Sequence, residues 1–552
     1  MAALFAGALS SAAQRTSPHI DQQTGQFLLN GQPFLMLGGE LGNSSSGTAA
    51  QADVILPRLA QMHLNTVLTP VLWEQIEPTE GNFDFSVIDH WIATAREQHL
   101  HLVLLWFGSW KNATSGYAPA WVKRDPQRFP RVLTADGQPT DILSPLGEQT
   151  MNADSHAFAA LLHHLHETDA TQQTVLMLQV ENEVGVLGDS RDRSPRANAL
   201  FSQAVPAELM HALSASPRAL SPELARVFHP DGKNWQEVFG PQAGEAFMSY
   251  YYAKFISAVA AAGKREYDLP MYANAQLPAP QERAGEYPSG APHPAMLPIY
   301  QAVASAQAAP SLDCFSPDIY WPNFAYWVER YAERERPVFI PEARLEPAPY
   351  NALYAFGAAR AFGFSSFAVD SLTPSDDPAK QPALQQLYTQ LDSLADLLPA
   401  AQQQNRTAGL VLYADSARPM QTVALGGYLF HATLSRTWPA RALATENGTI
   451  LIVQLAPDDF LVLGSGLTIT LATDPDVRTG TAGILSVDEV TRSDGRLKVL
   501  RHLNGDQTNQ GRDVALDPKQ FELLHVRLYT IRMALRISSV EETGRLAAAG
   551  CR

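Results

Sequence analysis

Eight short apolar segments alternate with helical segments between about residues 20 and 400, and this alternation constrains the fold more than any other feature. Most of the apolar segments end in polar or aromatic residues. Eight strand–helix repeats predict a (β/α)8 TIM barrel, whose active site lies at the carboxyl ends of its strands. A doubly wound α/β sheet is the alternative, but no glycine-rich phosphate loop follows the first segment. The predicted strands are residues 34–40, 65–70, 102–108, 175–183, 270–274, 315–320, 337–342 and 364–370.

The chain of 552 residues is too long for a single core, so more than one domain is expected. We assign residues 21–400 to the catalytic barrel, with one large insertion at about 186–245. In residues 401–533, short β-type runs alternate with turns rich in Gly and Asp, which predicts an all-β, sandwich-like domain. Residues 534–552 are less regular and are predicted to form a tail outside both domains.

Residues 1–20 resemble the remnant of a secretory leader, because they are apolar and small, although a basic start is missing. This pattern predicts a periplasmic or secreted protein. No apolar run is long enough to span a bilayer. The formal net charge of −16 disfavours nucleic acid as a partner and suits a neutral substrate such as a carbohydrate. The two cysteines, Cys314 and Cys551, cannot form a disulfide framework.

The fourth apolar segment runs directly into Glu181, Asn182 and Glu183 and stops at Gly185. A buried strand should not end in three polar groups unless they face a cavity or a partner. An isolated Asn-Glu pair is more often a solvated helix cap, but at a barrel rim a carboxylate can meet substrate while partly desolvated. Glu342 closes the seventh segment, and the ends of strands four and seven face each other across the barrel mouth. Glycoside cleavage with retention needs two carboxyl groups about 5–5.5 Å apart, and Glu183 and Glu342 are the predicted pair.

Three segments of the chain extend this pattern. They are residues 179–183, residues 65–85 with their Trp73-Glu74, Glu77-Pro78 and Gly81–Phe85 elements, and Ala118-Pro119-Ala120-Trp121. With these segments, residues 25–375 resemble the glycoside hydrolases of clan A, specifically family 35, the β-galactosidases. The resemblance implies that Glu183 is the acid/base, Glu342 the nucleophile and Asn182 a donor to the sugar 2-hydroxyl. In a regular strand Glu181 would point to the same side as Glu183, so Glu181 is expected to be a supporting carboxylate.

The chain also departs from the pattern of this family. Val184 stands where a Tyr usually follows the Asn-Glu pair, and Ala343 stands where an aromatic residue usually follows the nucleophile. The third strand usually ends in Ala-Glu-Trp, with that Glu reading the galactose hydroxyls, whereas residues 106–112 contain no carboxylate. The resemblance therefore supports the assignment of the catalytic residues more strongly than the assignment of the sugar. The pattern looks like a divergent bacterial branch, some of whose members trim galactose from plant xyloglucan.

Other polar and aromatic residues at strand ends are candidates for holding the sugar. Tyr320 is expected to hydrogen-bond Glu342, and Glu40 either supplies the missing polar contact or acts as a structural cap. Arg344 either adds positive potential or forms a structural ion pair. Rings at the rim are candidates for stacking on sugar faces, with Trp106 and Tyr320 preferred. The further candidates are Trp73, Trp110, Trp321, Asn112, Asn274 and Asp318.

We therefore expect a retaining exo-β-glycosidase, specifically a β-galactosidase releasing terminal β-D-galactose from oligo- or polysaccharides. No cofactor is needed, because two carboxylates suffice for double displacement. No metal site is expected either, since the run His163–His166 lacks the spacing of a zinc helix. One alternative is a β-glucosidase or β-xylosidase of the same clan, which the altered third strand favours. Another is a non-catalytic carbohydrate-binding protein, which would have no reason to retain both glutamates.

Overall fold

The computed structural model describes residues 16–305, 311–334, 337–437, 442–503 and 505–532. A parallel sheet has the strand order β12-β14-β4-β5-β6-β9-β10-β11-β13. Strands β12 and β13 flank Pro341, which has no N–H to donate to a ladder, and they pair with β14 and β11 respectively. The two pieces act as one barrel strand, so the sheet closes into the predicted eight-stranded TIM barrel. The strands are β4 (Met36–Glu40), β5 (Thr66–Leu72), β6 (His101–Phe107), β9 (Val175–Val180), β10 (Met271–Gln276), β11 (Cys314–Ile319), β12 (Phe339–Ile340), β13 (Glu342–Ala343) and β14 (Gly363–Phe364).

Two predicted strands are shorter in the structure. The fourth was predicted to continue to Glu183, but β9 ends at Val180, because Glu181 and Glu183 have φ angles of 63° and 45°. The eighth was predicted to reach residue 370, but β14 ends at Phe364. A left-handed residue, Ala368 (φ 55°), and a short 3₁₀ turn at Val369–Ser371 follow it. Both errors lie at the carboxyl ends of strands, where the backbone bends toward the site.

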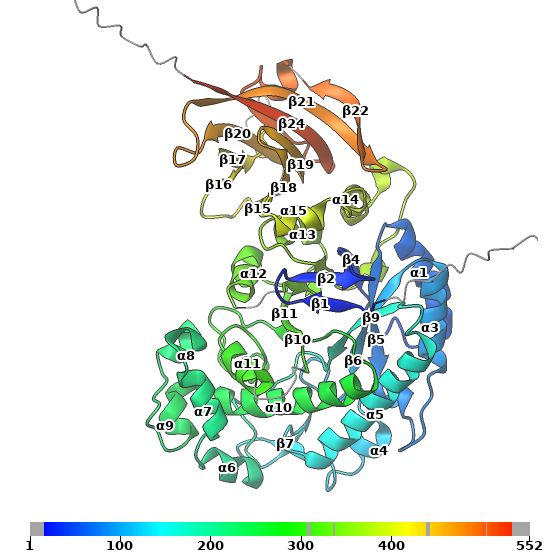
Figure 1. Cartoon of the computed structure of the whole chain (residues 1–552). Coiled ribbons are helices and arrows are strands. Elements are labelled where there is room, and N and C mark those ends of the chain that lie inside the picture. Colours follow the sequence, from blue (N-terminus) through cyan, green and yellow to red (C-terminus); the bar gives the residue numbers. More distant parts are fainter. Residues whose placement is uncertain (1–15, 306–310, 335–336, 438–441, 504, 533–552) are drawn as a thin grey trace, which may run out of the picture.

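Helices surround the barrel (Figure 1). Those that pack on it bury an apolar face. In the first of them, the apolar side chains of Ile55, Leu56 and Leu59 recur at helical spacing and are buried. The barrel helices are α1 (Ala49–Gln61), α2 (Trp73–Ile76), α3 (Ser86–Glu97), α4 (Ala120–Lys123), α5 (Glu148–Thr168), α10 (Ala243–Glu266), α11 (Leu297–Ser305), α12 (Phe324–Ala332), α13 (Ala348–Gly357), α14 (Ala383–Asp392) and α15 (Leu398–Gln403). The predicted insertion is helical, with α6 (Pro195–Phe201), α7 (Ala207–Ser214), α8 (Pro222–Ala225) and α9 (Trp235–Phe239). None of the helices in the described part of the chain is both long and apolar enough to cross a membrane.

A small antiparallel sheet closes the barrel at the amino ends of its strands. It consists of β1 (His19–Asp21), β2 (Gln26–Leu29) and β3 (Gln32–Pro33). Phe27 from β2 is fully buried, and its ring centroid lies 5.8 Å from that of Phe362, which immediately precedes β14. The opposite end of the barrel therefore remains for a site. Residues 1–15 of the predicted leader lie outside the described residues. A second small hairpin, β7 (Arg131–Leu133) and β8 (Pro139–Leu143), follows α4.

The predicted all-β domain is confirmed as two antiparallel sheets. A six-stranded sheet has the order β15-β18-β19-β24-β21-β22, and a four-stranded sheet has the order β16-β17-β20-β23. Buried side chains such as Ile452, Phe460 and Leu524 fill the space between them. The strands are β15 (Thr407–Tyr413), β16 (Met420–Leu425), β17 (Tyr428–Leu434), β18 (Asn447–Ala456), β19 (Asp459–Ser465), β20 (Leu467–Thr473), β21 (Thr481–Ser493), β22 (Arg496–Leu503), β23 (Asp513–Ala515) and β24 (Glu522–Ile531). The predicted tail, residues 534–552, lies outside the described residues.

The β domain packs closely on α13, the helix that follows the seventh barrel strand (Figure 1). A Cβ atom added to Gly409 would lie 2.9 Å from the backbone oxygen of Leu353. Thr449 Oγ1 donates a hydrogen bond of 2.9 Å to the backbone oxygen of Tyr350. Buried residues of the six-stranded sheet, including Leu451, belong to the same apolar cluster as the barrel. The domain therefore braces the barrel beside the strand that carries Glu342.

Candidate active site

A pocket of about 270 Å³ opens at the carboxyl ends of the barrel strands. This volume is close to the lower limit of about 300 Å³ for small-molecule sites, and it suits a ligand the size of one sugar ring. All of the lining residues belong to the barrel and to the loops that follow its strands. They are Asn43, Lys111, Asn112, Glu183, Gln276, Leu277, Asp318, Tyr320, Trp321, Glu342 and Phe367.

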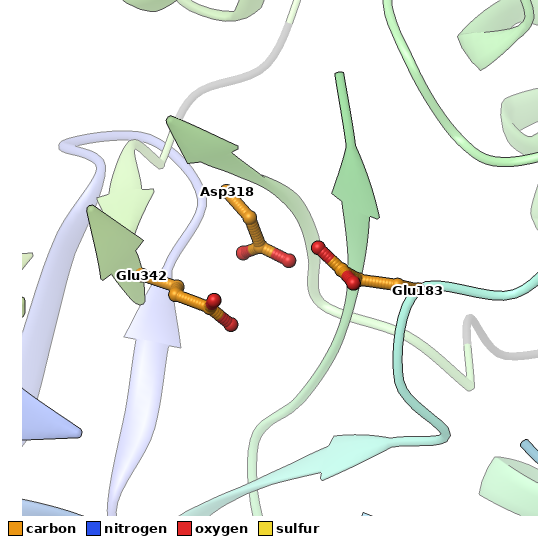
Figure 2. A group of neighbouring side chains, drawn as sticks. All are labelled: Glu183, Asp318 and Glu342. Atoms are coloured by element: carbon orange, nitrogen blue, oxygen red, sulfur yellow. The ribbon is translucent and has the colours of Figure 1, made fainter. Parts of the chain in front are cut away.

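Three carboxylate side chains point toward one another in this pocket (Figure 2). Glu183, Asp318 and Glu342 come from the ends of strands four, six and seven, and one oxygen of each lies within 4.8 Å of the others. All three side chains are almost fully buried. The structure thus brings together the two predicted carboxylates and adds Asp318, which the sequence suggested only as a weaker polar candidate.

The bend after β9 separates Glu181 from Glu183. Because both residues adopt left-handed φ angles, the alternation of a regular strand does not apply, and the prediction that both point to one side is wrong. Such strained residues cluster at functional sites, where the surrounding contacts hold them. The Glu183 backbone N–H donates a hydrogen bond of 2.9 Å to Asn274 Oδ1. Glu181 instead accepts a hydrogen bond of 2.8 Å from the backbone N–H of Trp110, behind the pocket wall.

Two asparagines and Asp318 form a hydrogen-bond chain around Glu183. Asn112 Nδ2 donates a hydrogen bond of 2.6 Å to Glu183 Oε2. Asn274 Nδ2 donates one of the same length to Asp318 Oδ2. Burial raises the pKa of Glu183 to about 7, the charge of Glu342 adds to this rise, and the charge of Lys111 opposes it. Glu183 is therefore poised to exchange a proton near neutral pH.

Two further buried carboxyl groups have raised pKa values, which favour their protonated forms. Burial, followed by repulsion from Glu342, raises the pKa of Glu40 and that of Asp318 well above their usual range. Asp318 shares a hydrogen bond with Glu183, and Glu40 shares one with Glu342. Glu40 does not line the pocket but supports Glu342 from the end of strand one. Four carboxyl groups can share this small volume because protonation reduces their mutual repulsion.

Tyr320 donates its hydroxyl hydrogen bond to Glu342 Oε1, as the strand positions predicted. The two residues lie at the ends of β11 and β13, which are paired neighbours in the barrel. Arg344 points away from the site: its Nε lies 2.8 Å from Glu346 in an exposed ion pair. Of its two predicted roles, the structure shows the structural ion pair.

The predicted sugar-stacking positions of Trp106 and Trp110 are wrong. Both indoles are fully buried, and their N–H groups donate to Asp154 Oδ1 (2.8 Å) and to the backbone oxygen of Leu143 (3.0 Å). A large ring whose N–H finds a buried acceptor is stable in the core and has no free face for a ligand. Trp73 is buried in the same way. The partly exposed rings at the pocket are Tyr320, Trp321 and Phe367.

Behind the wall, Asp154 and Glu181 form a buried acid pair. Asp154 accepts from Trp106 Nε1 and from the backbone N–H and hydroxyl of Ser109 (2.9 and 2.5 Å). Burial, with added repulsion from Asp154, raises the pKa of Glu181 well above its usual range, so Glu181 donates a proton to their shared hydrogen bond. This pair fixes residues 106–110, which lead directly to Lys111 and Asn112 in the pocket.

Asn182 is fully buried, and its Oδ1 accepts a hydrogen bond of 3.3 Å from the backbone N–H of Asn112. Its Nδ2 has no hydrogen-bond partner among the described residues, but the atom is buried and Asn182 does not line the pocket. The sequence did not single out Lys111, Asn43, Gln276 or Phe367 as site residues. Their position just after barrel strands was the only signal that could have identified them.

The oxygens of Glu183, Asp318 and Glu342 are also close enough together to hold a metal ion. Metal ligands must be deprotonated, however, and the raised pKa values of Glu183 and Asp318 disfavour that state at neutral pH. The histidines of α5 lie elsewhere on the surface, where His163 and His164 pair with Glu266 and Asp89. The chemistry of the cluster thus suits proton exchange better than cation binding.

Comparison with known proteins gives similarities for both domains. Residues 45–247 match a family model described as β-galactosidase, glycoside hydrolase family 42, and residues 384–515 match a domain of unknown function (DUF5597). A β-galactosidase of Xanthomonas manihotis is 26% identical over 207 residues, which are 35% of this chain and 31% of that protein. The match thus spans about a third of the relative's length.

Solved structures with similar folds include glycosidases. A β-galactosidase from Bacillus circulans sp. alkalophilus superposes with a TM-score of 0.43 and 14% identity, over 66% of this chain and 57% of that one. An exo-β-1,4-mannosidase from Opitutaceae bacterium strain TAV5 gives a TM-score of 0.37 and 14% identity, over 63% and 54%. The family model and the curated relative do not single out family 35. They make the barrel of this chain similar to the β-galactosidase-like glycoside hydrolases of clan A.

Proposed function

We propose that this protein is a retaining, exo-acting β-glycosidase that releases terminal β-D-galactose from oligo- or polysaccharides. The observation that carries the proposal is the pocket in which oxygens of Glu183 and Glu342 lie within 4.8 Å of each other. Retaining enzymes hold their two carboxyl groups about 5–5.5 Å apart, whereas inverting enzymes separate them by about 6.5–9.5 Å to admit a water. The small volume of the pocket supports action on a single terminal sugar.

In the first step, the Glu342 carboxylate attacks the anomeric carbon, and the bond to the leaving oxygen breaks as Glu183 gives that oxygen its proton. In the second step, water attacks the anomeric carbon, Glu183 takes the water proton, and the bond to Glu342 breaks. The pKa of Glu183 near 7 suits both directions of proton transfer. The hydrogen bond from Asp318 lowers the pKa of Glu183 and so stabilises the carboxylate that forms after its proton leaves.

Asn182 and Tyr320 support these roles. The unpaired Asn182 Nδ2 is suited to donate to the sugar 2-hydroxyl, a contact that strengthens in the transition state. The Tyr320 hydroxyl orients Glu342 for attack. The sugar assignment to galactose, including side chains of xyloglucan, rests on the similarity to β-galactosidases and on the family 35 resemblance. We further propose that the protein is exported, since polymeric substrates lie outside the cell.

A β-glucosidase or β-xylosidase activity is the second candidate. The loop after strand three favours it, because this loop presents Lys111 and Asn112 to the pocket rather than a carboxylate. A carbohydrate-binding protein without catalysis is disfavoured, because binding alone does not require a proton-exchanging Glu183 beside Glu342.

The test is hydrolysis of nitrophenyl β-galactoside, β-glucoside, β-xyloside and β-fucoside by wild type, Glu342→Gln and the control Glu346→Gln. Glu346 is a surface residue in an ion pair, so its variant should match wild type. We expect galactoside hydrolysis that Glu342→Gln abolishes without loss of folding. Preference for another sugar would keep the mechanism and refute galactose. Near-normal activity of Glu342→Gln would refute the nucleophile assignment.

A second test addresses the acid/base. Glu183→Ala should lose most activity toward poor leaving groups, since a good leaving group needs no proton. Azide should partly restore its turnover, because a small nucleophile needs no general base. Equal losses for all leaving groups would exclude Glu183 as the acid.

A further inference from the structure

Lys111 is a buried cation that faces the pocket, and no described residue forms an ion pair with it. Its side chain is only 5% exposed, yet its nitrogen keeps access to the pocket, which the residue lines. Among the described residues, the ammonium has no hydrogen bond or ion pair, and it lies 4.9 Å from the centroid of the Phe107 ring. A buried charge costs free energy unless water or another polar group pairs with it. A sugar that displaces water from the pocket must therefore offer the ammonium an acceptor.

The loop that carries Lys111 is held firmly in place. Lys111 and Thr114 exchange two backbone hydrogen bonds of 2.8 and 3.1 Å. Between them, Asn112 and Ala113 both adopt left-handed φ angles, of 50° and 62°, in a tight turn. The Asn112 side chain is fixed on Glu183 at 2.6 Å. The turn thus fixes the backbone of Lys111 beside the pocket, which the residue lines.

The position of Lys111 relative to the catalytic pair limits which part of the sugar it can meet. Under the proposed mechanism the anomeric carbon lies between Glu183 and Glu342, and Asn182 serves the 2-hydroxyl. The 3-, 4- and 6-hydroxyls remain for other contacts. An ammonium has three donors and no acceptor, so it binds a hydroxyl through that group's oxygen. A carboxylate at this position would accept from the hydroxyl, so Lys111 reverses the direction of the bond.

We propose that Lys111 is a specificity-determining residue of the sugar site, donating a hydrogen bond to one hydroxyl at position 3, 4 or 6 of the terminal sugar. The proposal rests on the proposed function. A neutral sugar fits better than a sugar acid, because a further carboxylate would be placed in a pocket that already holds the charge of Glu342.

A double-mutant cycle tests this assignment. kcat and KM are measured for wild type, Lys111→Met and the control Lys254→Met, on the best-hydrolysed nitrophenyl glycoside and its 3-, 4- and 6-deoxy analogues. Lys254 is an exposed lysine on α10, 5.6 Å from the centroid of the Tyr250 ring, so its variant removes a comparable cation outside the pocket. Any effect of the Lys111 charge on Glu183 is common to all substrates and cancels in the cycle.

In wild type and Lys254→Met, removing the hydroxyl that Lys111 binds should lower kcat/KM by about 10- to 100-fold, the range for a hydrogen bond to a charged group. In Lys111→Met the same deletion should change kcat/KM by less than about threefold, within the error of such cycles. Equal penalties in all three enzymes at every position would overturn the proposal. A preference of wild type for a β-glucuronide or β-galacturonide would overturn it as well.

Failure of the proposed function is recognised separately, as absence of turnover by wild type on the whole glycoside panel. In that case calorimetric titration of wild type and Lys111→Met with galactose, glucose, xylose and their deoxy analogues tests Lys111 alone. Loss of affinity in Lys111→Met for sugars that carry one particular hydroxyl would support the assignment. Indistinguishable affinities, or no binding to wild type, would overturn it.

Discussion

Asn112, in the loop after the third barrel strand, donates a hydrogen bond of 2.6 Å to Glu183, just beyond the end of the fourth. The same loop is anchored from behind, where Trp110 N–H donates to Glu181. One loop thus connects the buried acid pair Asp154–Glu181 with the proposed acid/base. The position of Glu183 therefore depends in part on Asp154 and Glu181, which do not line the pocket.

The pH dependence of the reaction should follow the pKa of Glu183. The general acid acts in its protonated form and the nucleophile in its ionised form, so the pH profile of kcat/KM should be bell-shaped. On its alkaline side, log(kcat/KM) should fall with a slope of −1 above about pH 7. Because the Lys111 charge lowers this pKa, Lys111→Met should move the alkaline limb to higher pH, whereas Lys254→Met should not. An alkaline limb centred near pH 4.5 in wild type would contradict the assignment of Glu183 as the general acid.

Removal of the negative charge at position 342 should lower the pKa of Glu183. Repulsion from Glu342 is the second contribution to its rise, after burial, so Glu342→Gln leaves burial alone to raise it. The measurement is a titration of Glu183 by ¹³C NMR of glutamate-labelled protein, with Glu183→Gln used to assign the signal. An unchanged pKa in Glu342→Gln would mean that the two carboxylates do not interact as the structure indicates.

Tyr320→Phe removes the hydroxyl that orients Glu342. A hydrogen bond to a charged group contributes about 1.5–3 kcal/mol, so kcat should fall by about 10- to 150-fold. Tyr326→Phe provides a control, since Tyr326 is an exposed tyrosine on α12 whose hydroxyl pairs with Arg330. A drop in kcat of less than threefold for Tyr320→Phe would show that the hydroxyl does not serve Glu342 during turnover.

The sequence predicted the barrel and the ends of its strands because these follow from periodic patterns. All eight strands were located, and Glu183 and Glu342 meet in one pocket as expected for opposing strands. The direction of Trp106 could not be predicted, because it depends on local register and on Asp154, which lies 48 residues away. The left-handed bends at Glu181 and Glu183 are equally invisible in the sequence, since tertiary contacts impose them. Lys111 was part of a segment noted only for lacking a carboxylate.

Glu181→Gln should retain the acid pair, whereas Glu181→Ala should not. The Gln amide can donate to Asp154 while its oxygen accepts from Trp110, so the cost in unfolding free energy should stay below about 1 kcal/mol. Glu181→Ala leaves buried partners unsatisfied and should cost about 2–4 kcal/mol. Both variants are compared by urea unfolding with Glu167→Gln, an exposed change on α5. Equal costs for Gln and Ala would argue against a shared hydrogen bond.

The same pair should make stability depend on pH. The pKa of Glu181 is raised in the folded state above its usual value of 4.5. Its contribution is therefore fully present below pH 4.5 and is lost as pH rises toward the folded pKa. Glu181→Gln has no such group, so its unfolding free energy relative to wild type should improve between pH 5 and pH 9. A difference that is constant over this range would show that Glu181 does not titrate as a buried acid.

The contact between the β domain and α13 should couple the two domains in unfolding. A methyl group at Gly409 would lie 2.9 Å from Leu353 O and 3.1 Å from Ala358 N, both backbone atoms that cannot move aside cheaply. Gly409→Ala should therefore cost about 1–3 kcal/mol, as overpacking typically does. Gly116→Ala is the matched control, because a Cβ there meets no atom within 4 Å. Since one apolar cluster spans both domains, calorimetry should show a single transition that moves to lower temperature in Gly409→Ala. Two resolved transitions, of which only that of the β domain moves to lower temperature, would mean that the two domains unfold independently. In that case the β domain would not stabilise the strand that presents Glu342.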